Sequence, residues 1–489
     1  MAVFSVTPTE STFSVEVGEV TSLAVDSANA AAASAAAALA SELAAAADAA
    51  LANAALDLTR VDLYGEPLDK DAALILGFAP VPYLGRDDAG IGGNPVQIMA
   101  AEETALGLTL TRRDFSSIID FTRASSATFV GDNGLIQTAG NNVPRIDHDS
   151  LTRETKGLLV EGQRANLLPR SAEFDNVIWE KGGVTVGVDV TTSPDGGPDA
   201  DKLVEDATTG FHRTAQVVSL TAATHSLSFF AKAQERNWVF GGDISEGRIA
   251  YFDLANGVVG FTAGGAVGSI VRYASNWYRC TVVFTTPAPS NNFIGVGLTI
   301  GDATQSYTGS VGNGAFFWGA QLEVGASPTS YIPTVASQVT RSACNARITG
   351  AKFSEWFNAT AGTFVVEAVA PSTVSAPVLV GYNAASTASL FVNGANASTW
   401  NGAVQVTQVG GDLESNVFFK AALAYSLTGR SVTSNGGVPT SDASLIGAAD
   451  VLALGRPGFS NDQFLNGCIR SVRFWPYRFS NADLQSITV

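Results

Sequence analysis

Residues 28–56 read ANAAAASAAAALASELAAAADAALANAAL, and this nearly pure alanine run contrasts with a remainder rich in Gly, Thr, Ser, Val and Phe. Alanine has the highest intrinsic helix propensity, so the run predicts one helix. A methyl group buries too little apolar surface to build a globular core. The contrast therefore predicts a thin helical stalk or anchor that leads into a β-rich head, a shape typical of fibrous or spike-like structural proteins.

Three leucines mark one stripe of this predicted helix. Leu39, Leu43 and Leu51 recur at spacings of four and eight residues, and alanines fill the neighbouring positions. The stripe is too narrow for the core of a monomer, but it suits close packing between helices of different chains. We therefore expect self-association through an oligomeric stalk, most simply a homotrimer. The alternative is a helix that is flexible or docks locally.

The overall composition narrows the class of protein. Of the 489 residues 46% are hydrophobic and only 15% are charged, and the formal net charge is -17. Binding to nucleic acid or to anionic membranes needs basic patches, so neither partner is expected. Polar and charged residues interrupt the alanine run, so we expect no membrane insertion. The N-terminus shows no basic region followed by an apolar one, so we expect no secretory signal.

The cysteines give no sign of a covalent or metal framework. Cys280, Cys344 and Cys468 lie far apart and show no C-x-x-C spacing. An odd and sparse set argues against a disulfide framework and against a zinc site. We expect all three to be buried as small apolar residues.

Strand signals flank the alanine run. Thr12–Val17 alternates apolar and polar residues, as a half-buried strand does. Residues 58–109 carry many prolines and glycines, which break regular elements, so they predict an extended connector with short helices and a docking role. The turn Gly131–Gly134 separates two apolar pairs and predicts a hairpin. Further strands are expected at Ser226–Ala231, Arg279–Thr285, Phe293–Ile300, Ala315–Leu322 and Thr363–Val369.

Regular short strands from Phe115 to the C-terminus predict a mainly β fold with two tandem β-sandwich or jelly-roll domains behind the alanine-rich stalk. We expect the fragment from about Gly350 to fold alone, because it carries its own strand series and a closing helix that Ser480 caps. The predicted segments are an N-terminal anchor at 1–114, a β-rich linking element at 115–165, a jelly roll at 166–340 and a sandwich at 341–489, with the last boundary inside 339–351.

Three phrases occur in order between Asp120 and Leu168, namely DFTRASSATFVGDNG, NNVPRIDHD and GLLVEGQRANLL. This succession resembles a recurrent element of bacteriophage virion proteins, notably tail-fibre and head-fibre or spike proteins. The continuation through HSLSFFAKA, NWYRCTVVFT and FFWGAQLEVGASPTSYIPT resembles the carbohydrate-binding-module-like jelly roll of such proteins. The C-terminal part, from FSEWFNATAGTFVVEA to NGCIRSVRFWPYRFSNADLQSIT, is similar to their concanavalin A-like or laminin-G-like sandwiches.

The resemblance implies a structural protein of the virion that presents a face for glycans or for the host surface. It implies partners among other virion proteins through the N-terminal region, and a location in the phage particle after synthesis in the host cytoplasm. Two alternatives stay open, a phage-borne polysaccharide depolymerase and a lectin-like secreted module.

Enzymatic residues are scarce in this chain, so we expect no enzyme. The histidines are His148, His212 and His225, and none stands in a pattern that pairs it with a nucleophile. His148 lies between two aspartates, for which a turn-forming role is the simpler interpretation. A glycosidase needs two carboxylates beside the scissile bond, and no strand carries closely alternating acidic residues.

Sugar binding is the activity that the residues favour. Aromatic faces stack on the apolar face of a pyranose, while amides and carboxylates bond its hydroxyls. Trp277 and Trp318 are expected in the core, since buried packing is the common role of tryptophan in a sandwich. The candidate glycan-binding residues are Trp400, Asn396, Asn401, Trp238 and Tyr251.

No cofactor is expected, apart from a structural calcium ion that β-sandwiches of this kind can hold. The oxygen-rich turns Asp132–Asn133 and Asn461–Asp462 are the candidate sites. The ordinary role of such residues in turns is the favoured interpretation.

Overall fold

The computed structural model describes residues 4–6, 12–13, 15–17, 74–78, 98–104, 107–113, 115–371, 376–383, 388–457 and 463–489. The chain forms two compact units that are interleaved in sequence. We call Phe121–Thr155 with Leu159–Asn345 the jelly-roll unit. Met1–Asp120, Lys156–Leu158 and Ala346–Val489 form the sandwich unit.

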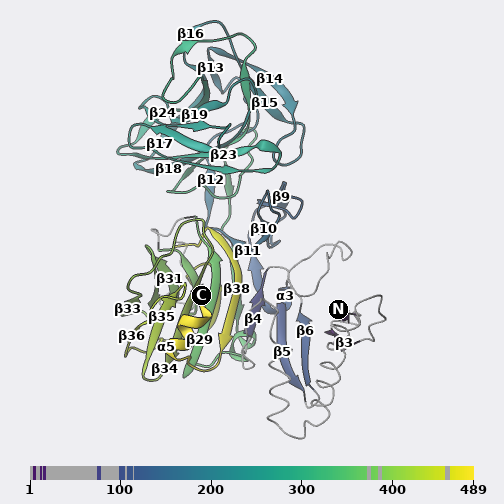
Figure 1. Ribbon diagram of the computed structural model, residues 1–489, viewed down its shortest axis with the longest axis vertical. Helices are drawn as coiled ribbons and strands as arrows, with labels where there is room; N and C mark the ends of the chain where they lie inside the picture. The colour runs from purple at the N-terminus through teal and green to yellow at the C-terminus, as the bar shows by residue number, and fades with distance from the viewer. Residues whose placement is uncertain are drawn as a thin grey trace, which may run out of the picture. The chain divides into compact units, whose positions relative to one another are not determined.

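The jelly-roll unit contains two six-stranded antiparallel sheets (Figure 1). The first runs in the order β13 (Glu180–Gly182), β17 (His212–Leu220), β24 (Ser290–Thr299), β19 (Trp238–Asp243), β20 (Arg248–Asp253) and β21 (Val258–Thr262). The second runs in the order β14 (Val184–Thr191), β15 (Ala200–Glu205), β26 (Gly314–Val324), β18 (Ala223–Ala233), β23 (Tyr278–Thr286) and β22 (Val267–Arg272).

The core of this unit lies between the two sheets and follows from strand alternation. Phe229 points into the core and its neighbour Phe230 points to the opposite face, since successive side chains of a strand alternate. The Phe229 ring occupies the space that a side chain at Gly241 would need, because a Cβ there would lie 2.4 Å from the ring. The two sheets therefore approach closely at this glycine.

A second layer covers the outer face of the second sheet. Phe230, Trp277, Trp318 and Tyr331 form one buried cluster there, and Trp318 and Tyr331 have ring centroids 4.6 Å apart. Trp277 and Trp318 are 0% and 2% exposed, which confirms their predicted core role.

Short elements complete the jelly-roll unit. The predicted hairpin forms, with Val130 of the first strand paired to Ile136 of the second. The elements are β8 (Ala127–Val130), β9 (Ile136–Ala139), β10 (Ile146–His148), β12 (Arg164–Asn166), β16 (Thr209–Gly210), η2 (Ala274–Asn276), β25 (Tyr307–Thr308) and β27 (Val339–Arg341).

The described residues of the sandwich unit form two large sheets. One runs in the order β2 (Thr12–Phe13), β6 (Gly107–Arg113), β5 (Ile98–Thr104), β4 (Leu74–Gly77), β38 (Gly467–Trp475), β29 (Ala361–Val369), β34 (Phe419–Ser426), β35 (Gly429–Ser434) and β36 (Thr440–Asp442). The other contains β33 (Gln405–Thr407), β32 (Asn396–Trp400), β31 (Ser389–Asn393), β30 (Val378–Gly381), β37 (Val451–Leu454) and β28 (Asn345–Thr349).

Aromatic side chains fill the space between these sheets. Phe364 and Phe474, which are paired across β29 and β38, have ring centroids 4.7 Å apart. Tyr382 stacks on Phe364 from the second sheet at 6.2 Å and 13°. Packed rings, one pair tilted and one pair stacked, therefore contribute to an apolar core between the sheets.

The predicted closing helix forms as α5 (Asn481–Ile487) and lies against β34 and β35 (Figure 1). The Ser480 hydroxyl accepts from the Asp483 amide while the Asp483 carboxylate accepts from the Ser480 amide. This reciprocal pair satisfies two donors at the start of the helix. Leu484 is fully buried in a cluster with Trp475 and Phe479, so α5 covers the outer face of the first sheet.

The remaining elements are β1 (Phe4–Val6), β3 (Val15–Val17), α3 (Phe115–Ile118) and α4 (Ala351–Ser354), together with β7 (Asp120–Thr122) and β11 (Thr155–Val160), whose residues are divided between the two units.

The mainly β prediction is confirmed, because strands dominate the described residues and the helices there are short.

The described residues of the connector at 58–109 form strands, and β4 pairs directly with β38. The short helices expected in this connector stay a prediction, because much of the connector lies outside the described residues. A fragment that starts at Gly350 would also lack β28, which pairs with β37 in the sandwich. The strand series of this unit is therefore not confined to the C-terminal part of the chain.

Candidate functional site

Trp400 ends β32 and stands directly between two polar neighbours. The register pairs Trp400 with Ser389 of β31 and with Gln405 of β33. Directly opposed residues place their Cβ atoms about 4.5–5.5 Å apart on one face of a sheet. We call these three residues the Trp400 platform.

The platform faces away from the aromatic core. The preceding residue, Thr399, is fully buried, and its hydroxyl lies 3.0 Å from that of the core residue Tyr382. Because side chains alternate along a strand, Trp400 points to the opposite face. Its side chain is half-buried, and its indole N–H donates to no residue in the described part of the chain.

The turn after Trp400 is held by a dense set of hydrogen bonds. The Asn401 carboxamide oxygen accepts from the amides of Ala403 and Val404 at 3.0 and 2.8 Å. The buried Arg430 donates to the Val404 carbonyl at 2.7 Å and to the Asp442 carboxylate. These bonds fix the ends of β32 and β33, so the platform is preorganised.

The charge state of Asp442 follows from this arrangement. Partial burial raises its pKa, but hydrogen bonds from Arg430 and Ser444 outweigh burial and lower the pKa below its ordinary value. The carboxylate is therefore ionised at neutral pH and keeps its bond to Arg430.

Asn396 and Asn401 are near Trp400 in the chain, but their amides serve the backbone. The Asn396 carboxamide oxygen accepts from the Gly411 amide at 2.8 Å. The Asn401 amide nitrogen donates to the Leu445 carbonyl at 2.9 Å. Both side chains thus form hydrogen bonds that hold the loops. A glycan-binding role for them stays a prediction.

Trp238 and Tyr251 lie in the other unit, on the outer face of the first jelly-roll sheet. Tyr251 is only 2% exposed and packs in a cluster with Phe240 and Ile249. Burial, with a smaller effect of Asp302, raises its pKa to about 12. An accessible stacking ring is not present at Tyr251, which corrects the expectation for this residue. Trp238 is partly buried against the same cluster, and its role in binding stays a prediction.

Ser389 and Gln405 were not among the residues expected from the sequence. Gln405 is exposed and donates from its amide nitrogen to the Thr407 hydroxyl at 2.8 Å. Its carbonyl oxygen accepts from no residue in the described chain. Ser389 is only 8% exposed, so the groups available here are the Trp400 indole and the Gln405 amide oxygen, which can stack on a ring and bond its substituents.

The histidine between two aspartates has a structural role. His148 Nδ1 lies 3.2 Å from the Val130 carbonyl, and the Asp147 carboxylate accepts from the Val130 amide at 2.8 Å. Asp149 accepts from two amides of its own turn at 2.9 Å. The predicted turn-forming role is seen at Asp149, whereas Asp147 ties this segment to Val130 of β8.

The other two histidines are buried in the jelly-roll unit. His225 Nδ1 lies 3.5 Å from the Thr286 hydroxyl. His212 packs against Tyr307 with ring centroids 4.4 Å apart and planes tilted by 31°. Neither of its ring nitrogens has a hydrogen-bond partner among the described residues, and the Asp206 carboxylate is 4.0 Å away. A base bonded to a nucleophile and oriented by a carboxylate is not assembled at either histidine.

Two carboxylates approach each other at the Ser193 turn. Asp195 and Asp199 each place an oxygen 2.5 Å from the Ser193 hydroxyl. Asp199 also accepts from the Trp318 indole at 3.2 Å, and Asp195 accepts from the Gly197 amide at 2.9 Å. The pair surrounds a protein hydroxyl, and its bonds hold the turn.

The cysteines, the oxygen-rich turns and the stalk leucines were also singled out in the sequence. The three cysteines are buried, as expected. In the turn Asp132–Asn133, the Asn133 carboxamide accepts from the Leu135 amide, which is the turn role. Asn461, Asp462 and the stalk residues Leu39, Leu43 and Leu51 lie outside the described residues. Among those that are described, no helix is both long and apolar enough to cross a membrane.

Solved structures share only distant similarity with the chain. Domain 4 of an extracellular arabinanase from Geobacillus stearothermophilus, in complex with arabinotriose, matches with a TM-score of 0.25 and 8% identity over 33% of this chain and 82% of that chain. A pentraxin from Limulus polyphemus matches with a TM-score of 0.21 and 11% identity over 27% and 70%. Domains LG4-5 of the mouse laminin alpha1 chain match with a TM-score of 0.19 and 12% identity over 56% and 90%.

TM-scores this low carry no argument about function. The functional proposal therefore rests on the residues of this chain. No protein-family model matches the chain, and no curated protein matches its sequence.

Proposed function

We propose that this protein is a non-enzymatic structural fibre or spike protein of a phage virion, and that its sandwich unit binds a host-surface glycan through the Trp400 platform. The observation that carries the binding part is the half-buried indole of Trp400, placed directly between Ser389 and Gln405 on an outward face. The virion part is supported by the phage-type phrases between Asp120 and Leu168.

The platform suits a sugar for physical reasons. A pyranose has an apolar face, which gains from contact with an indole, and hydroxyls at its edge, which need polar partners. Gln405 is exposed and offers an amide oxygen next to the ring, whereas Ser389 on the other side is only 8% exposed and supports the indole. The fixed turn after Trp400 lowers the entropy lost on binding, because the binding groups are already ordered.

The depolymerase alternative is less well supported. Cleavage of a glycosidic bond needs two carboxylates that flank the substrate, with a water or nucleophile between them and the sugar. Asp195 and Asp199 instead flank the hydroxyl of Ser193 and bond the surrounding turn. The secreted lectin-like module shares the binding chemistry and differs in where the protein is found.

The proposal also covers assembly. Chains associate through the stripe of Leu39, Leu43 and Leu51, most simply as a homotrimer, and the N-terminal region contacts other virion proteins. The protein is made in the host cytoplasm and carried in the particle, without nucleic-acid binding, membrane insertion or a cofactor. Deletion of residues 1–60 followed by measurement of the mass in solution tests the stalk. An oligomer of unchanged size would place the contacts elsewhere.

One experiment separates binding from cleavage. The full-length chain is incubated with an array of purified bacterial surface polysaccharides, and both retention and released reducing ends are measured. We expect retention on at least one polysaccharide without release of reducing ends. Steady release would replace the structural function by a depolymerase. Neither retention nor release would remove the glycan-binding function.

A further inference from the structure

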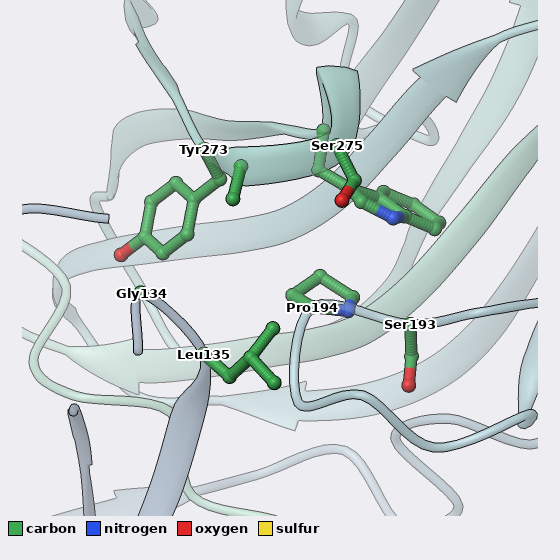
Figure 2. Close-up of a pocket in the computed structure, with 8 residues that line it drawn as sticks. Gly134, Leu135, Ser193, Pro194, Tyr273 and Ser275 are labelled. Atoms are coloured by element: carbon green, nitrogen blue, oxygen red, sulfur yellow. The ribbon is translucent and has the colours of Figure 1, made fainter. Parts of the chain in front are cut away.

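A hollow beside Tyr273 shows how little free space the jelly-roll unit leaves. Figure 2 shows Leu135 and Pro194 on one side of it and Tyr273 and Ser275 on the other. The enclosed volume is about 10 Å³, which is room for about one water molecule. Polar side chains buried in such close packing depend on protein partners, and a buried group that lacks one calls for a reason.

His225 is a buried group of this kind. It lies in β18 two residues before the core residue Leu227, so its side chain points between the two sheets. The side chain is fully buried and stacks on Phe284 of β23, with ring centroids 5.8 Å apart. Nδ1 lies 3.5 Å from the Thr286 hydroxyl, and Nε2 has no hydrogen-bond partner among the described residues. The position therefore suits a neutral imidazole.

The first sheet places a buried carboxylate at the same end of the interior. Asp243 follows Gly241, the glycine that faces the second sheet, by two residues in β19. Asn292 precedes the core residue Ile294 by two residues in β24. Both side chains are fully buried and point between the sheets, since side chains alternate along a strand. The interior is therefore polar at the end where His225 lies.

The Asp243 carboxylate has its hydrogen-bonding positions filled. Oδ2 accepts from the Asn292 amide and from the Arg248 guanidinium, each at 2.7 Å. Oδ1 accepts from the Ser245 hydroxyl at 2.8 Å and from the Glu246 amide at 3.4 Å. A carboxylate offers about four such positions. Asp243 thus holds the turn between β19 and β20 and can accept from a new donor only by releasing a present one.

The charge that acts on His225 comes from Asp243. Arg248 lies beyond that carboxylate and is 3.7 Å from Glu246. Glu323 of the neighbouring strand β26 alternates with core residues and points to the opposite face of the second sheet. A proton on His225 would therefore be attracted to a carboxylate that Arg248 already pairs with.

The energetics oppose a charged His225 in the folded state. Burial lowers the pKa of His225, and the Ala223 backbone and the Asp243 charge offset this effect only in part. An unfolded histidine titrates at about pH 6.5. A lowered folded pKa means that the stability of this region is full above about pH 6.5 and is lost as the pH falls through that value. The effect of Glu161 falls in a more acidic range.

We propose that His225 is an acid-sensitive latch between the two sheets of the jelly-roll unit. In mild acid its imidazole takes up a proton, and Nε2–H then needs an acceptor in a space that offers none. The imidazolium draws Asp243 away from Ser245 and Arg248, which releases the turn between β19 and β20 and opens this end of the unit. The latch uses no residue of the Trp400 platform, so the two proposals can fail separately.

Hydrogen exchange of the full-length chain tests the latch. Deuterium uptake is followed by mass spectrometry at pH 7.5 and pH 5.5, with rates corrected for the intrinsic effect of pH. We expect the protection of residues 243–248 to fall about three- to tenfold at pH 5.5, the upper limit being what one proton allows one unit below the ordinary pKa. Peptides from β34 in the sandwich unit serve as the reference. Equal protection of residues 243–248 at both pH values would overturn the proposal.

Variants assign the response to His225. His225→Phe keeps a ring that can stack on Phe284, and His225→Gln keeps a polar group; neither takes up a proton, so both should lose the response. Thr286→Val changes the same site but keeps the imidazole, so it should retain the response. His225→Gln serves where His225→Phe fails to fold. An undiminished response in either folded His225 variant would assign it to another group and refute the latch.

Discussion

Arg145 and Glu161 form an ion pair with 2.7 Å between Nη2 and Oε2, and their side chains are 0% and 2% exposed. Glu161 also accepts from the Ser330 amide and hydroxyl at 2.6 and 2.8 Å, and Arg145 donates to the Thr128 carbonyl at 2.7 Å. The pair joins distant segments of the jelly-roll unit. Thr128, Arg145 and Glu161 lie within the three phrases between Asp120 and Leu168, so these phrases encode part of a buried polar framework.

Replacement of Glu161 by Gln should destabilise the jelly-roll unit by about 3–5 kcal/mol, because the buried Arg145 guanidinium would lose its counter-charge. Glu173→Gln is the matched control. Its pair with Arg170 has the same 2.7 Å separation but is 31–40% exposed, so the loss should be at most about 1 kcal/mol. Chemical denaturation measures both. Equal effects would show that burial does not strengthen the Glu161 pair.

Stability should fall in acid because of the same carboxylate. Burial raises the pKa of Glu161, but Arg341, Arg145 and Ser330 outweigh burial and lower it to about 2. A lowered folded pKa gives stability that is present above the ordinary value of about 4.3 and is lost as the pH falls toward 2. Denaturation midpoints between pH 6 and pH 2 measure this loss. An identical pH profile in Glu161→Gln would assign the acid sensitivity to other groups.

Ser480→Ala should destabilise the sandwich unit by about 0.5–2 kcal/mol, because the reciprocal cap of α5 is lost and Leu484 is held less firmly. Ser486→Ala provides the control, since Ser486 is exposed in the same helix and its side chain caps nothing. Thermal unfolding of the two variants gives the comparison. A loss of similar size in both would mean that the cap does not anchor the helix.

The fragment that starts at Gly350 should not form a stable monomer. It lacks β28, whose Ala346 and Ile348 are fully buried, and it lacks β4, which pairs with β38. Unpaired strand edges of this kind promote aggregation. Size-exclusion chromatography and a thermal melt of the fragment test this expectation. A monomer with one cooperative transition would restore the simpler domain boundary.

Local signals predicted the local structure well. The Gly131–Gly134 turn and the Ser480 cap each depend on a few neighbouring residues, and both form as expected. Trp277 and Trp318 were expected in the core and are buried there. Strand alternation and turn chemistry act over short stretches, so they can be read from the sequence.

Long-range pairing could not be predicted in the same way. β4 gains its strand structure from β38, which is far away in the chain, and the prolines and glycines around it hide the signal. The candidate site was likewise only partly predictable from the sequence. Trp400 was a candidate from the sequence, but its place at the end of β32 and its neighbours Ser389 and Gln405 are set by strand register. The burial of Tyr251 likewise depends on packing against Phe240 and Ile249.

The measurement that tests the account most directly is the affinity of Trp400→Ala for the bacterial surface polysaccharide that the unmodified chain binds most tightly. The account predicts a loss of about 1–3 kcal/mol, by analogy with the stacking of bases on aromatic side chains. Phe261→Ala, which removes a ring that is 52% exposed in the other unit, should bind as the unmodified chain does. A folded Trp400→Ala protein with undiminished affinity would contradict glycan recognition by the Trp400 platform.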